Sequence, residues 1–148
     1  MSTNGQVNLE ALADYSNAAL PAAWEPRGLI GPFWDDLYVA GTTDVMVHAT
    51  QGAAGARVFI AEWYRASWLH DSAAELIFQL RLYEADGHLE YVYGPLMPNG
   101  TDSPSRRDAA GGSATVGLQS YERDSGVTCG FNNAGVTLSG SWLAFFPR

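Results

Sequence analysis

The fold is decided by residues 75–93, which read ELIFQLRLYEADGHLEYVY. Before the turn, four apolar side chains fall on one face, Leu76, Phe78, Leu80 and Leu82, while Glu75, Gln79 and Arg81 fall on the other. A two-residue period is typical of a β-strand with one buried face. Asp86-Gly87 separates this run from a second alternating run, and the dipeptide accepts the positive φ angles of a tight turn. The stretch therefore predicts an antiparallel β-hairpin.

Working outward, four further stretches have the composition of short strands between turns: residues 44–49, 57–63, 114–121 and 141–146. Many short strands with frequent turn signals predict an all-β chain, an antiparallel β-sandwich with long loops. We expect its core to contain Phe78, Leu80, Leu82, Val116, Leu118 and Trp142. Cys129 is expected at a buried strand position. Two stretches are predicted to differ: residues 9–19 as a short N-terminal helix ended by Pro21, and residues 95–112 as a long surface loop.

Length and charge narrow the class of protein. The chain has 148 residues, of which 47% are hydrophobic, so we expect one domain with one core over residues 1–148. Eight arginines, no lysine and 16 acidic residues give a formal net charge of −8. Such a chain has no electrostatic attraction for nucleic acid or an anionic membrane surface.

The sequence predicts neither a membrane span nor a signal peptide. No apolar run approaches the roughly 18 residues of a membrane span. The opening residues, MSTNGQ, lack the pattern of a signal peptide. The chain is therefore expected to be intracellular or a mature part of something longer, and the motifs below favour the second.

The sequence contains no motif of an enzyme. His48, His70 and His88 stand singly, and Cys129 is the only cysteine. No nucleophile elbow, phosphate-binding loop or dinucleotide fingerprint occurs. We predict a protein without catalytic residues and without an organic cofactor.

The pair Asp35-Asp36 has two interpretations. In the first, the chain turns there and both carboxylates bind Ca²⁺, with Asp44 or a backbone carbonyl completing the site. In the second, one aspartate caps backbone N–H groups in the turn and the other is solvated. The second is preferred, because no Asp-x-Asp-x-Asp loop is present.

Aromatic residues suggest a contact surface. Five tryptophans are many for this length, and aromatic rings can stack on sugars. Trp34, Trp63 and Trp142 lie in apolar strand motifs and are expected in the core. Trp68 follows a strand, so the candidate contact patch is Tyr64, Trp68 and Tyr121.

Four segments resemble, in order and spacing, the motifs of nidogen-like domains, especially those of bacterial secreted and surface proteins. They are LIGPFWDDL at 29–37, FIAEW at 59–63, FQLRLYE at 78–84 and ATVGL at 114–118. Upstream, Ser16-Asn17 and Leu20-Pro21 fit the usual lead-in to the first motif. The resemblance covers residues 4–148.

The resemblance implies an extracellular or cell-surface β-sandwich that serves adhesion, binding or assembly, with no catalytic residues to transfer. Family members usually have strands before a segment such as the one that starts at Asn4, and their absence would leave an open sheet edge at Val7, Asn8 and Leu9. We therefore expect a protein partner or the chain itself, as a homo-oligomer or filament, at that edge. The alternative is a carbohydrate-binding module that uses exposed Trp and Tyr side chains.

Overall fold

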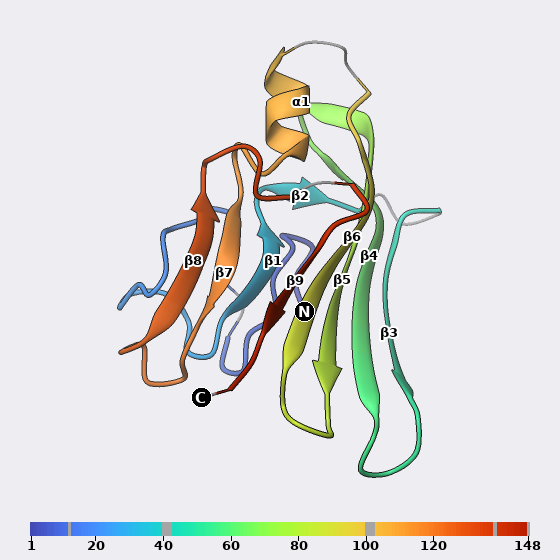
Figure 1. Cartoon of the computed structure of the whole chain (residues 1–148). Coiled ribbons are helices and arrows are strands. Elements are labelled where there is room, and N and C mark those ends of the chain that lie inside the picture. Colours follow the sequence, from blue (N-terminus) through green and yellow to red (C-terminus); the bar gives the residue numbers. More distant parts are fainter. Residues whose placement is uncertain (12, 40–42, 100–102, 138, 148) are drawn as a thin grey trace.

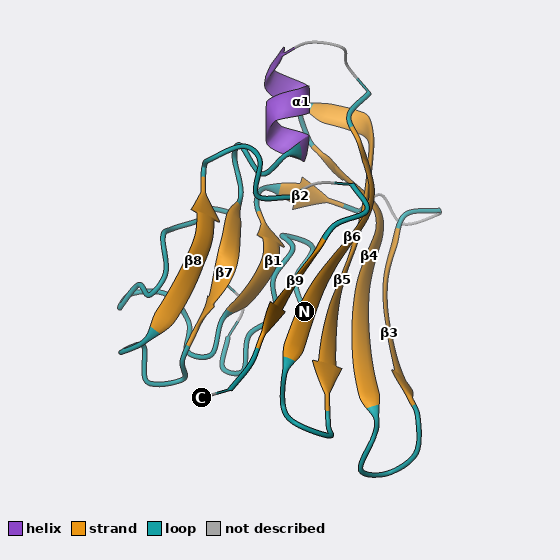
Figure 2. Cartoon of the chain, in the orientation of Figure 1, coloured by secondary structure: helices purple, strands orange, loops and turns teal. Residues whose placement is uncertain are grey.

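Two antiparallel sheets pack face to face in the computed structural model, which describes residues 1–11, 13–39, 43–99, 103–137 and 139–147 (Figure 1). The smaller sheet has the order β1 (Ile30–Trp34), β7 (Thr115–Gln119) and β8 (Gly126–Phe131). The larger sheet has the order β2 (Leu37–Tyr38), β4 (Val58–Trp68), β5 (Asp71–Tyr83), β6 (Leu89–Met97) and β9 (Trp142–Phe145), with β3 (Val45–Gln51) also paired to β4. The predicted all-β sandwich is confirmed (Figure 2).

The hairpin predicted at residues 75–93 is confirmed, and its two strands are β5 and β6. Leu80 lies opposite Tyr91, and Leu82 lies opposite Leu89. Gly87 has a φ of 74°, which glycine adopts without strain. The N–H of Tyr83 donates to the carbonyl of His88 at 3.0 Å and closes the turn.

The main core lies between the sheets and is largely aromatic. The rings of Trp63 and Phe78 stack at 4.8 Å, and Phe33 stacks on Phe78 at 5.5 Å. Two buried tyrosines connect the sheets, because a buried hydroxyl needs a hydrogen-bond partner. Tyr91 Oη donates to the carbonyl of Gly117 and Tyr93 Oη to that of Pro32, both at 2.7 Å.

The predicted core is confirmed in part. Phe78, Leu80 and Val116 are buried. Leu82 and Leu118 are only half-buried, because they lie toward the end of the sandwich where the sheets separate. Trp142 is exposed, which contradicts the prediction.

A second apolar cluster covers the other face of the small sheet. It contains Ala13, Leu20, Ala22, Leu29 and Trp34. The predicted helix at 9–19 is wrong for its described residues, which form bends and irregular backbone. Polar groups of residues 9–19 bond instead to residues in or beside the small sheet. The side-chain amide of Asn17 donates to the carbonyl of Ser113 at 2.7 Å, and the carbonyl of Asp14 accepts from the Trp34 indole at 2.8 Å.

The predicted loop at 95–112, of which residues 100–102 lie outside the described residues, is also wrong in part. β6 continues to Met97, because Pro95 falls at a register shift between β5 and β6, where a strand tolerates proline. The helix α1 (Ser103–Ala109) follows, with Pro104 in its first turn and two arginines in its last turn. Within the described residues, no helix is long and apolar enough to cross a membrane.

Candidate interaction edges and surfaces

Charge is absent from the strands at the sheet borders. The two-residue β2 shares one side of β4 with β3, so the long free borders of the large sheet are β3 and β9, and β8 is one border of the small sheet. None of these three strands contains an Asp, Glu, Arg or Lys. The charged strand residues all lie in β4, β5 and β6: Glu62, Arg65, Asp71, Glu75, Arg81 and Glu90. This is the reverse of the usual protection of sheet edges by charge.

β3 is the longest of these borders. All seven of its residues pair with β4, from Val45 opposite Tyr64 to Gln51 opposite Val58, without a register shift. Val45 and Val47 point to the outer face of the sheet and are 37% and 44% exposed. Asp44 just before the strand pairs with Arg65, and Arg57 after it pairs with Glu84, while Glu62 of β4 lies opposite Val47.

β8 is interrupted by a bulge. Val116 lies opposite Gly130 and Gly117 opposite Thr128, so Cys129 is the extra residue. Cys129 is exposed, and the prediction that it is buried is wrong, since a bulged residue at a border has no strand on its far side. Val127 and Phe131 are also exposed.

β9 presents aromatic rings to the outer face. Trp142 lies opposite Val92 and is 62% exposed, and Phe146 just after the strand is 67% exposed. The core prediction failed at Trp142 because β9 turns Leu143 and Phe145 inward instead. Apolar residues at both phases of the alternation cannot be assigned to a face from sequence alone.

The predicted assembly edge at Val7–Leu9 is partly occupied by the chain itself. Val7 and Ile30 exchange two backbone hydrogen bonds of 2.8 Å, so the border of β1 is covered there and the expectation of an open edge is wrong at Val7. Asn8 bonds to the side chain of Gln6. Leu9 is exposed beside Gly28.

The three residues of the predicted contact patch do not form one surface. Trp68 is 1% exposed, because β4 continues through it and pairs it with Leu37 and Asp71. Tyr64 is exposed on the large sheet. Tyr121 is exposed in the turn between β7 and β8, with the Arg27 guanidinium 5.3 Å from its ring centre. The prediction that Trp68 belongs to an exposed patch is therefore wrong. Tyr64 belongs to the large sheet, and Tyr121 to a turn of the small sheet.

Asp35 and Asp36 differ in their environments. The buried Asp35 carboxylate accepts from Trp68 Nε1 at 2.8 Å, Ser113 Oγ at 2.6 Å and its neighbour's N–H at 2.9 Å. Asp36 is exposed. Desolvation, together with the charge of Asp35, raises the pKa of Asp108. Protein donors thus satisfy Asp35, and the described residues contain no group of three His, Cys, Asp or Glu side chains arranged for a metal.

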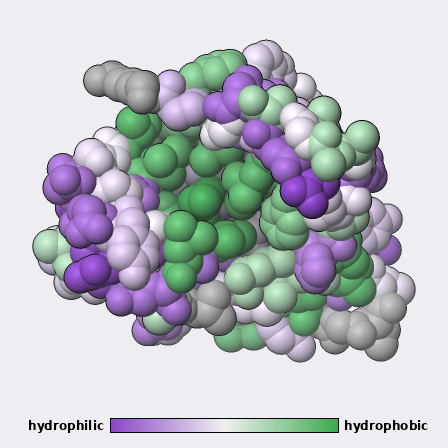
Figure 3. Space-filling model, turned by 90° about the horizontal axis from the view of Figure 1, so that it is seen from below, coloured by the Kyte–Doolittle hydropathy of each residue, from purple (hydrophilic) through white to green (hydrophobic). Residues whose placement is uncertain are grey.

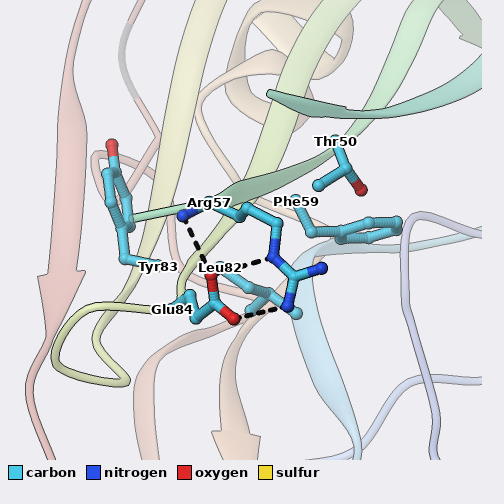
Figure 4. Close-up of a pocket in the computed structure, with 6 residues that line it drawn as sticks. All are labelled: Thr50, Arg57, Phe59, Leu82, Tyr83 and Glu84. Atoms are coloured by element: carbon cyan, nitrogen blue, oxygen red, sulfur yellow. Dashed lines mark hydrogen bonds and ion pairs between the residues drawn. The ribbon is translucent and has the colours of Figure 1, made fainter. Parts of the chain in front are cut away.

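The sandwich is hollowed at the end where the β3–β4 and β5–β6 turns lie. Seen from below, apolar side chains gather in this hollow (Figure 3). One row across the large sheet contributes half-buried apolar residues: Phe59, Leu82, Leu89 and Phe145. A pocket of about 330 Å³ includes Thr50 and Phe59, with an ion pair at its rim (Figure 4).

That ion pair joins Arg57 and Glu84. The Glu84 carboxylate accepts from Arg57 Nη2 at 2.5 Å and Nε at 2.9 Å, and from the backbone N–H groups of Arg57 and Gly55. These donors, the Arg57 side chain first, lower the pKa of Glu84 to about 2. The pair fixes the β3–β4 turn to the end of β5.

Together these features define an antiparallel β-sandwich module with uncharged borders. The chain belongs to the NIDO-related family, the nidogen-related domains, whose model matches residues 1–141. No curated protein and no solved structure matches the chain. Membership suggests an extracellular-type module, and the family is one of non-enzymatic modules.

Proposed function

We propose that this chain is a non-catalytic extracellular module that assembles with other protein chains, copies of itself included, through its uncharged sheet edges. The observation that supports the proposal is the distribution of charge over the strands. Every charged strand residue lies in β4, β5 or β6, and the borders β3, β8 and β9 have none. An exposed border with unpaired N–H and C=O groups is a template for strand addition.

Electrostatics makes this distribution informative. A net charge of −8 keeps copies apart over most of the surface. A strand added at an uncharged border buries no ionised side chain, so it avoids the desolvation penalty of a buried charge. Assembly is therefore least opposed at the borders.

The test places one lysine on each border. The variant Val47→Lys, Val127→Lys, Trp142→Lys changes exposed residues of β3, β8 and β9. Its matched control has the same added charge on β4, β5 and β6, as Tyr64→Lys, Ala73→Lys, Met97→Lys, all at exposed positions.

Light scattering over a concentration series gives the result. We expect the mass of the wild-type and control chains to rise with concentration, and that of the border variant to stay at the monomer value. A wild-type chain that remains monomeric over the whole series would contradict the proposal.

Exposed aromatic residues favour carbohydrate binding as a second function. Trp142 and Phe146 flank the small Ala144 on the outer face of the large sheet, and Glu90 lies beside Ala144 in β6. Rings on an open sheet face, beside polar groups, suit the apolar faces of sugars. Titration with soluble polysaccharides tests this function: binding that is lost in Trp142→Ala and kept in Tyr121→Ala supports it, and no binding by the wild-type chain excludes it.

A further inference from the structure

We propose that β3 pairs antiparallel with β3 of a second copy, across a two-fold axis that passes beside His48. This inference rests on the proposed assembly function and names the partner and the register. Such a contact is isologous: both copies use the same strand, and the two large sheets become one continuous sheet.

The regularity of β3 distinguishes it from the other borders. Proteins blunt an edge with a bulge, a very short strand, proline or charge. β8 has the bulge at Cys129, and β9 has only four residues. β3 has seven residues in unbroken register and contains neither proline nor charge. It is the border that best templates a further strand.

The far side of β3 is available for pairing. Among the described residues, the backbone of β3 has hydrogen-bond partners only in β4. In an antiparallel ladder, alternate residues of the border strand direct their N–H and C=O away from the sheet. The outer-face side chains Val45 and Val47 are exposed and would be partly covered by the added strand.

Charge favours a second copy as the occupant. The charges nearest to the ends of β3 already have partners in the chain: Asp44 lies 3.7 Å from Arg65, which also bonds to Glu75, and Arg57 bonds to Glu84. A strongly acidic or basic partner segment would find no complementary charge along the strand. An uncharged copy of the same strand meets no like charge, although each chain has a net charge of −8.

The length of β3 sets the register. Overlap of all seven residues places His48 opposite itself, with Val47 opposite Ala49 and Val45 opposite Gln51 of the second copy. Val47 and Ala49 share the outer face, where a β-branched and a small side chain pack side by side. Any other register leaves strand residues unpaired at both ends.

A disulfide cross-link tests the register. The background Cys129→Ser removes the only native thiol. In it, His48→Cys places two thiols at directly opposed positions, where Cβ atoms about 4.5–5.5 Å apart come close to disulfide geometry. The control Val45→Cys separates its two thiols by six residues of strand, roughly 20 Å. Under mild oxidation we expect a covalent dimer from His48→Cys and none from Val45→Cys or the background.

A second measurement does not depend on the cross-link. Val47→Lys, checked for its fold by circular dichroism, is expected to weaken self-association at least about tenfold in sedimentation, whereas Tyr64→Lys leaves it unchanged. If the wild-type chain associates but His48→Cys forms no dimer and Val47→Lys associates normally, the β3 pairing is wrong and the assembly function stands. A monomeric wild-type chain would overturn both.

Discussion

The two sheets of this molecule differ in how many of their faces are covered. At β1 and β7 the small sheet is covered on both faces, because the large sheet packs on one face and the second cluster around Leu20 and Leu29 covers the other, whereas most of β8 is exposed. The large sheet is buried on its inner face only, and its outer face presents Val47, Tyr64 and Trp142 to solvent. The faces of the small sheet are therefore closed to partners at β1 and β7, whereas the large sheet offers a face and two borders.

The difference shows in how polar groups are satisfied. On the covered face, Gln119 accepts from the N–H of Ala22 and donates to the carbonyl of Pro26, both at 2.8 Å. On the open face, Gln79 donates to Glu62 at 3.1 Å and accepts from Arg81 at 2.9 Å, within reach of solvent. A polar group under a cover needs protein partners, because water cannot replace them.

The largest expected difference in the free energy of unfolding is between substitutions of two tryptophans, one on a covered face and one on the open face. Trp34→Ala should lower the free energy of unfolding by about 3–5 kcal/mol, because the ring is buried under residues 13–22, the covering segment of the small sheet. Trp142→Ala, on the open face, should lower it by less than about 0.5 kcal/mol. Urea unfolding of both variants gives the comparison, and similar losses would show that the two faces are not different.

Substitutions of two glutamines give a second comparison of the covered face with the open face. Gln119→Ala leaves the buried N–H of Ala22 and the carbonyl of Pro26 without partners and should cost about 1–3 kcal/mol. Gln79→Ala is the matched change on the open face and should cost about 0.5 kcal/mol or less. Equal costs in urea unfolding would indicate that water reaches both sites.

A smaller effect concerns pH at the hollow end of the large sheet. The pKa of Glu84 is lowered to about 2, so its contribution to stability is present above its unfolded value near 4.5 and is lost as the pH falls toward 2. The melting temperature of the wild-type chain should fall across this window, and that of Glu84→Gln should fall less. Identical profiles would show that the Arg57 pair does not stabilise the fold.

Removal of metal ions is expected to have no effect on the melting temperature. Asp35 connects the end of β1 to Trp68 of the large sheet through protein donors, so EDTA should leave the melting temperature unchanged. A drop of several degrees that calcium restores would favour the calcium interpretation. Asp35→Asn and Asp36→Asn would then identify the binding carboxylate.

The contrast between the sheets also explains which predictions the sequence allowed. In strands such as β5 and β6, apolar and polar residues alternate because one face is exposed to solvent, and this alternation predicted both strands. β1 is buried nearly throughout, since both its faces are covered, and its sequence gives no period to detect. Trp68 was assigned wrongly because β4 continues through it, and Trp142 because β9 has apolar residues at both phases of the alternation. The uncharged borders of β3, β8 and β9 are visible in the sequence, but which strands are borders is not.

The covering segment has a consequence for the order of folding. Its contacts join distant parts of the chain: Leu20 bonds to Thr128, Ala22 to Gln119, and β1 pairs with β7. Contacts of such sequence separation form late and slow folding. During synthesis, β3–β6 can assemble first, while the residues that cover the small sheet wait for strands made almost a hundred residues later. The exposed apolar side chains of that segment are then the natural target for a chaperone.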